Sequence, residues 1–133
     1  MHNFRHRVRR SQRGQAVVEF AFILPLLLLL ILGITELGRM IMRTNLLTQA
    51  AREGVRRAAV GEPADSVVAR VENVFYASAN VAPTSVNVNG PDVNNMMQVT
   101  VTSDYTVLGS GVGWFNLPNT VTLRGSSMMR LEN

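Results

Sequence analysis

Apolar residues near the start of the chain form one long block. No charged residue occurs from Phe20 to Thr35, a run of 16 residues. Counted from Gln15, the segment reaches about 20 residues, the length at which an α-helix crosses a hydrocarbon core of about 30 Å. Pro25 lies inside the run, where it removes one backbone donor and clashes with the preceding turn. The pattern therefore predicts a membrane-spanning helix with a local kink at the proline.

Helical spacing continues beyond this run. Residues 36–60 contain no proline, and their apolar positions recur three or four residues apart until Gly61 and Pro63 end the pattern. One helix of residues 15–60 would place about half of its length outside the bilayer. Two pairs of opposite charge have the spacing of ion pairs along a helix: Glu36 with Arg39, and Glu53 with Arg57.

The rest of the chain changes from helical to alternating periodicity. Residues 64–79 have a second helical pattern, whereas alternation predicts strands at 82–90, 97–107 and 119–130, the last preceded by a Gly-rich loop at 109–118. The predicted fold class is α+β: a long N-terminal helix with a membrane-spanning first half and a Pro kink, followed by a short helix and a small three-stranded antiparallel sheet.

Positive charge is concentrated before the apolar run. All thirteen basic residues are arginine; five lie in the first fourteen residues without an acid, and the rest of the chain carries eight arginines and nine acidic residues. A basic cluster of this kind keeps the N-terminus in the cytoplasm and contacts membrane lipid, so the C-terminal part is expected outside the cytoplasm. Because the excess of positive charge is confined to this leader, we expect no nucleic acid as a partner.

Glu19 is the one charged residue between Ala16 and Ile34. A carboxylate at the edge of a bilayer core is costly, which makes it a candidate for a functional residue. The alternative is that Glu19 reaches the lipid headgroups and is favoured there by the positive end of its own helix. Further along, Glu36, Arg39 and Arg43 are interpreted as anchors at the membrane interface.

Small residues recur every four positions in the second half of the long helix, at Ala50, Gly54 and Ala58. Such a ladder can admit another helix. The high helix propensity of alanine explains the same pattern, so both interpretations stay open. We also expect the sheet to pack on this half of the helix, where small side chains permit a close approach.

Catalytic chemistry finds little support in the sequence. There is no cysteine, both histidines lie in the leader at His2 and His6, and no Gly-rich phosphate loop leads into a helix. We therefore expect no enzyme, no cofactor and no metal site. Trp114 and Phe115 in the Gly-rich loop are interpreted as covering the small core, with contact to a partner or a membrane as the alternative.

The segment Gly14-Gln15-Ala16-Val17-Val18-Glu19-Phe20 resembles the processing site of type IV prepilins. Together with Pro25, the leucine run and Glu36-Leu37-Gly38-Arg39, it is most similar to the TadE-like minor pilins, or pseudopilins, of the tight-adherence (Flp) pilus. The resemblance implies that a prepilin peptidase cuts between Gly14 and Gln15, with Glu19 and Phe20 taking part in recognition or assembly. It also implies that Glu19 meets the new N-terminal amine of a neighbouring subunit. Gln15 departs from the Phe that is usual in classical type IV pilins.

The domain organisation that follows has four segments: 1–14, a cleaved basic cytoplasmic leader; 15–35, the transmembrane half of the helix; 36–61, its extracytoplasmic half; and 62–133, a small α+β extracytoplasmic domain. The resemblance implies a single-pass protein of the inner membrane that assists assembly or priming of the pilus. Such a protein can also be incorporated in the filament. Its expected partners are the prepilin peptidase, other pilins and minor pilins, and the inner-membrane assembly platform. Two alternatives stay open: an uncleaved single-span envelope protein with a small binding domain, and an adhesin whose Trp114 loop binds a surface.

Overall fold

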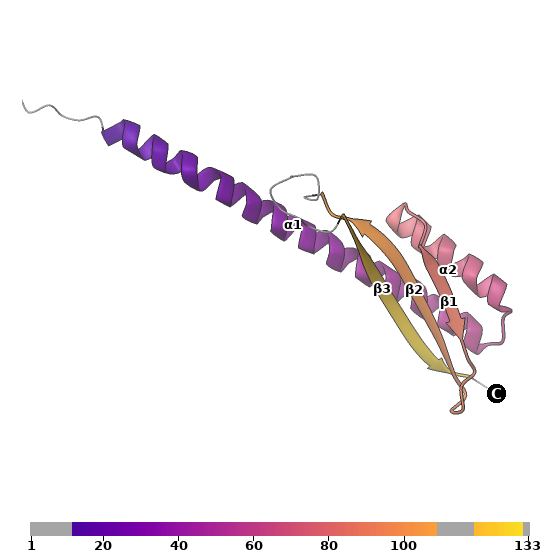
Figure 1. The fold of residues 1–133 in the computed structure, drawn as a ribbon. Helices are drawn as coiled ribbons and strands as arrows, with labels where there is room; N and C mark the ends of the chain where they lie inside the picture. Colours follow the sequence, from indigo (N-terminus) through magenta and orange to yellow (C-terminus); the bar gives the residue numbers. More distant parts are fainter. Residues whose placement is uncertain (1–11, 109–118, 132–133) are drawn as a thin grey trace, which may run out of the picture. The chain divides into compact units, whose positions relative to one another are not determined.

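The computed structural model describes residues 12–108 and 119–131, with side chains from Gly14 onward. In these residues two helices precede three strands (Figure 1). The elements are α1 (Gln12–Ala59), α2 (Ala64–Ala79), β1 (Ser85–Asn89), β2 (Met96–Thr106) and β3 (Thr120–Arg130). The predicted α+β fold class is confirmed, with a long apolar first helix, a short second helix and a three-stranded antiparallel sheet.

The chain divides between Thr35 and Glu36 into two compact units. In the first unit the described residues belong to α1, and every side chain from Gly14 to Thr35 is exposed. By length and composition, α1 contains a segment apolar enough to cross a membrane. Pro25 lies within the helix. The kink predicted there stays a prediction.

In the second unit, β2 is the central strand of the sheet, and β1 and β3 pair with it antiparallel on either side (Figure 1). Val88 of β1 lies opposite Val99, and Val101 lies opposite Gly125 of β3. Side chains alternate between the two faces of a strand. The valines of β2 therefore point to one face, and both are fully buried.

The core of the second unit forms where α1, α2 and the inner face of the sheet meet. Its largest fully buried side chain is Phe75 of α2. Burying a side chain of this size contributes about 1.5–3 kcal/mol relative to exposure. The buried members of the cluster are Leu47, Ala50, Ala51, Val55, Ala58, Val67, Val71, Phe75, Met97, Val99, Val101, Tyr105 and Leu123.

The strand bounds differ slightly from the predicted ones. Alternation predicts a first strand from residue 82, but β1 begins at Ser85. Pro83 has no N–H to donate to a ladder, so regular pairing begins only after it. Pairing with β2 is introduced by Thr84, whose backbone N–H donates to the carbonyl oxygen of Thr102 at 2.8 Å.

Candidate functional site

The residues of the predicted processing segment occupy the first turns of α1. Gly14, Gln15, Glu19 and Phe20 are all helical and exposed. The side-chain amide Nε2 of Gln15 donates to Oε1 of Glu19 at 3.2 Å. Residues four apart lie on one helix face. The structure therefore places the residue after Gly14 one turn from the carboxylate, on the same face.

The bond between Gly14 and Gln15 lies inside the helix as the structure describes it. A peptide bond in a helix becomes available to a peptidase only after the local turn opens. Glycine makes that opening easier, because it is less favourable than alanine in a helix by about 1 kcal/mol. No side chain restrains the turn either, since a Cβ added at Gly14 would meet nothing within 4 Å among the described residues.

The apolar side chains that follow Glu19 are not buried by any other described residues. Phe22 is 80% exposed and Leu26 is 70% exposed. An apolar surface of this extent is expected to contact lipid or other helices, because exposure of so many large apolar side chains to water is unfavourable. This surface agrees with membrane association of the N-terminal helix.

A buried polar cluster lies in the second unit around Glu36. The carboxylate oxygen Oε1 of Glu36 accepts the backbone N–H of Leu108, just beyond β2, at 2.9 Å. The other oxygen, Oε2, lies 3.9 Å from the guanidinium of Arg39 and has no hydrogen-bond partner among the described residues. One carboxylate thus connects α1 to the end of the central strand.

Tyr105 lies beside this carboxylate on β2. Burial raises the pKa of the Tyr105 hydroxyl, and the neighbouring Glu36 raises it further. The guanidinium of Arg43 stacks over the Tyr105 ring, 5.5 Å from its centroid, which is within the range of a cation–π contact. The three side chains form a set of charged and aromatic groups at one end of the sheet.

These contacts correct the interpretation of Glu36 as an anchor at the membrane interface. Its side chain is buried within the second unit rather than free to reach headgroups. The predicted ion pair with Arg39 is present at long distance, and the predicted pair of Glu53 with Arg57 is present at 3.3 Å. Periodicity missed the bond to Leu108 because the two residues are 72 positions apart.

Hydrogen bonds tie the end of α1 to the segment that follows it. The guanidinium of Arg57 donates to Glu53 at 3.3 Å and to Glu62 at 2.9 Å. These bonds, that to Glu53 first, raise the pKa of Arg57. Arg70 of α2 lies 3.6 Å from the same Glu53 carboxylate. The network connects both helices on the side of α1 that faces α2.

The ladder of small residues is covered by the chain itself. Ala50, Gly54 and Ala58 are all buried. A Cβ added at Gly54 would overlap Val71 of α2 and come within 3.2 Å of Val99 of β2. In the second unit the ladder thus admits the chain's own second helix and sheet. A further helix could use this ladder only by displacing these elements.

Gly125 is a second close approach, and the strand pattern did not single it out. A Cβ at this position of β3 would lie 2.5 Å from the backbone carbonyl carbon of Leu47 and 2.5 Å from the backbone nitrogen of Thr48. β3 therefore crosses α1 with its backbone almost against the helix backbone. An isolated glycine inside a strand pattern is the signal that indicates such an approach.

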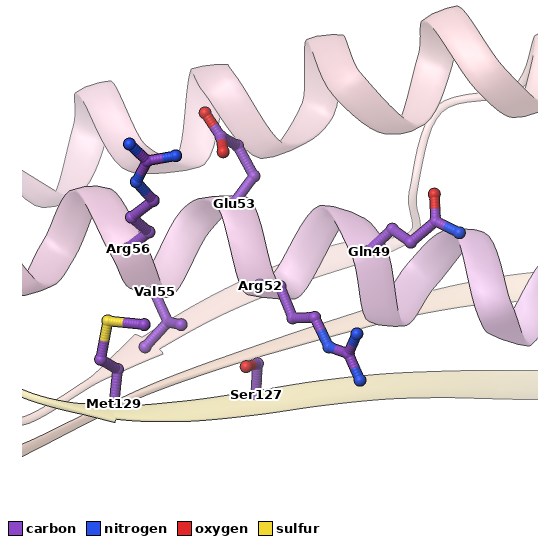
Figure 2. Close-up of a pocket in the computed structure, with 7 residues that line it drawn as sticks. All are labelled: Gln49, Arg52, Glu53, Val55, Arg56, Ser127 and Met129. Carbon is purple, nitrogen blue, oxygen red and sulfur yellow. The ribbon is translucent and has the colours of Figure 1, made fainter.

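A surface groove of about 480 Å³ lies between α1 and β3. We call it the α1–β3 groove; it is lined by Gln49, Arg52, Glu53, Val55, Arg56, Ser127 and Met129. Figure 2 shows Arg52 extending from α1 toward β3, where Ser127 and Met129 point back toward the helix. The groove combines the basic side chains of Arg52 and Arg56 with apolar surface from Met129, which is 40% exposed.

Several predicted features lie outside the described residues: most of the leader, with His2 and His6, and the Gly-rich loop with Trp114 and Phe115. Within the ranges 12–108 and 119–131, no group of three or more His, Cys, Asp or Glu residues is arranged to hold a metal ion.

Residues 14–56 match the family described as "TadE-like protein". The matched segment contains Gly14, Glu19, Pro25 and Glu36, and it supports a TadE-like protein associated with the Tad pilus. This family is structural rather than catalytic. No curated protein and no solved structure matches the chain significantly.

Proposed function

We propose that this TadE-like, Tad pilus-associated protein is a minor pilin that a prepilin peptidase cuts after Gly14 and that assists assembly or priming of the pilus. One observation carries the proposal: the family match begins at Gly14, the residue that the motif predicts as the last of the leader. The basic residues before it lie outside the match. The start of the matched segment and the predicted cleavage position thus fall at the same residue.

Glu19 is the residue through which we expect the mature N-terminus to act. Cleavage would leave a new amine at Gln15, one helical turn from Glu19. The Gln15 side chain donates a hydrogen bond to only one oxygen of the Glu19 carboxylate, Oε1. A carboxylate has about four acceptor sites, so its second oxygen can still accept from a neighbouring subunit's terminal amine. Pairing these opposite charges at the edge of the bilayer reduces the cost of holding each there alone.

Orientation follows from the arginines of the leader. Five arginines before residue 15 favour a cytoplasmic N-terminus, so the second unit would lie outside the cytoplasm. The protein would then cross the inner membrane once. The prepilin peptidase, other pilins and the inner-membrane assembly platform are its proposed partners, and no catalytic role is proposed.

An uncleaved envelope protein is the second candidate, and one observation favours it. The bond between Gly14 and Gln15 is helical rather than extended in the described structure. In that case residues 1–14 would remain as a permanent cytoplasmic tail, and the second unit would serve as a small domain anchored by α1.

Intact-mass measurement separates the two candidates. Co-expression of the full chain with a prepilin peptidase is expected to remove residues 1–14. Gly14→Phe should block the loss, because a bulky side chain replaces hydrogen beside the scissile bond. Gly33→Phe is the matched control on the same helix, since nothing described lies within 4 Å of a Cβ there either, and it should be cut normally. A mature protein that still starts at Met1, or one that starts beyond residue 30, contradicts the proposal.

A reporter that is active only outside the cytoplasm, fused after Asn133, tests the orientation. We expect activity from the wild-type leader. Replacing the five leader arginines with glutamine should reduce it, because the charge asymmetry that sets orientation is removed. Activity of a cytoplasmic reporter alone at the same position would contradict the proposed topology.

A further inference from the structure

The outer edge of β3 has backbone groups that no described strand satisfies. β3 is the last strand in the order β1-β2-β3, and it is 11 residues long. An exposed edge strand presents a row of N–H and C=O groups to which another extended chain can pair. The neighbouring α1–β3 groove lies beside this edge, so an added strand would also find side-chain contacts.

The register identifies which residues face outward. Val107 N–H donates to Asn119 O, and Leu131 N–H donates to Asn95 O, one bond just beyond each end of the β2–β3 ladder. In an antiparallel pair, hydrogen-bonded residues alternate with residues whose backbone groups face away. The odd-numbered residues of β3 therefore bond to β2. The even-numbered ones direct their N–H and C=O groups to the free edge, among them Thr122, Arg124, Ser126 and Met128.

Basic side chains surround this edge. β3 carries Arg124 and Arg130 and no acidic residue. Arg52 extends over the groove from α1 (Figure 2). In the described part of the chain, none of these three arginines takes part in an ion pair, whereas Glu53, the acid of the groove, is engaged by Arg57 and Arg70. Asp104 of β2 lies opposite Thr122 and accepts its hydroxyl, so the edge has one neighbouring acid but keeps an excess of positive charge.

We infer that the free edge of β3 binds an extended acidic segment of a partner protein, which adds to the sheet as a fourth strand. Main-chain hydrogen bonds to the even-numbered residues would hold the segment, as in other cases of strand addition. Its carboxylates would meet Arg52 on one face and Arg124 or Arg130 on the other, and an apolar residue would contact Met129, which is 40% exposed.

Charge also decides between this occupant and a second copy of the chain. Pairing β3 with β3 of another copy would add the two arginines of one strand to those of the other, and neither strand contributes an acid. Like charges placed opposite one another are destabilising. The inference concerns only the folded second unit, so it does not depend on cleavage at Gly14 or on a role in the pilus.

The first test uses a labelled nine-residue peptide of alternating threonine and glutamate, because threonine favours extended structure. Its binding to the purified full chain in nonionic detergent is measured by fluorescence anisotropy. An analogue with lysine in place of glutamate is expected to bind at least about tenfold more weakly, because it places like charges at the edge. Equal binding of the two peptides, or no binding of the acidic one, overturns the inference.

Variants separate charge from backbone pairing. Arg52→Glu should weaken binding of the acidic peptide about tenfold, whereas Arg39→Glu, the same change on the part of α1 beside Ser78 and Ala79, should not. Ser126→Pro removes one outward N–H without breaking the ladder to β2, so binding should fall while the thermal midpoint is unchanged. Ser126→Ala keeps the N–H and should bind normally. Binding that is insensitive to both Arg52→Glu and Ser126→Pro overturns the inference.

Amide hydrogen exchange by NMR gives a readout that simple charge attraction would not produce. When the acidic peptide binds, exchange should slow at Arg124, Ser126 and Met128, whose N–H groups face outward. Gly125 and Ser127 serve as internal controls, because their N–H groups already bond to β2. Uniform protection along β3 contradicts strand addition. Sedimentation that shows a dimer of the chain, dissociated by Ser126→Pro, would assign the edge to a second copy instead.

Discussion

Two stretches of α1 use apolar residues in opposite ways. From Gly14 to Thr35 every side chain is exposed, although almost all are apolar. From Glu36 to Ala59 one face of the same helix is buried by α2 and the sheet, with Leu47 and Val55 fully covered. The difference teaches that apolar content alone does not identify the partner: the second stretch finds its partner within the chain, and the first requires lipid or other helices.

The two glutamates of α1 show the same contrast. Glu19 is exposed, and its described hydrogen bond is to the neighbouring Gln15. Glu36 is buried, and its carboxylate accepts the backbone N–H of Leu108, just beyond the end of β2. We expect substitutions of Glu36 to change folding of the second unit, and substitutions of Glu19 to change assembly alone.

The largest expected difference is between two phenylalanines. Phe75 is fully buried, so Phe75→Ala should lower the free energy of unfolding of the second unit by about 3–5 kcal/mol through lost burial and a residual cavity. Phe22→Ala, the same substitution at an 80% exposed position, should leave that free energy unchanged. Urea unfolding of the full chain in nonionic detergent, followed by circular dichroism, measures both. Equal losses would contradict the division into two regions.

Two glycines sharpen the comparison at the backbone level. Gly125→Ala should destabilise the second unit by about 3 kcal/mol, because the new methyl group would press on the backbone of α1 rather than on a flexible side chain. Gly38→Ala meets nothing described within 4 Å and should be neutral or stabilising, since alanine is the better helix former. Thermal unfolding of the two variants decides the point, and a Gly125→Ala midpoint equal to wild type would be the contrary result.

Removal of the Glu36 carboxylate is expected to have a smaller effect. Glu36→Ala leaves the N–H of Leu108 without its acceptor and should cost about 2 kcal/mol. Glu36→Gln retains an acceptor oxygen and should recover most of this loss. If both variants unfold at the same urea concentration as wild type, the bond to Leu108 does not stabilise the fold.

How far the sequence predicts this fold depends on whether a feature is local. The bounds of α2 and the order of strands follow from periodicity, because they depend on neighbouring residues. The close approach at Gly125 and the bond from Glu36 to Leu108 join residues far apart in sequence, and no spacing rule contains them. The small-residue ladder was visible in the sequence, but only the structure shows that Gly54 faces α2 and β2.

The candidate site is predictable to a similar extent. The motif names Gly14 and Glu19, and helical spacing places Gln15 and Glu19 on one face, as the structure describes. The outward groups of β3 and the extension of Arg52 toward them needed the strand register and the packing of α1 against the sheet, which single-chain patterns do not supply.

The smallest expected effect is a dependence on alkaline pH. Burial, and then Glu36, raises the pKa of Tyr105 above its ordinary value of 10.0. A raised pKa in the folded state means that this contribution to stability is complete below the ordinary value and is lost as the pH rises through the folded one. Stability of the second unit should therefore fall above about pH 10, and Tyr105→Phe should flatten that fall. Tyr76→Phe, at a largely exposed position, is the control and should leave it unchanged.

The most direct test of the account is the pilus count of Glu19→Gln beside that of Glu36→Gln, in cells that carry the pilus machinery. Glu19→Gln keeps the shape and hydrogen-bonding capacity of the side chain but removes its charge. We expect normal insertion, normal cleavage after Gly14 and normal protein level on immunoblots, yet few or no pili by electron microscopy. Glu36→Gln should retain piliation in proportion to its protein level. Normal piliation by Glu19→Gln at normal protein level would contradict a role of the exposed half of α1 in assembly through Glu19.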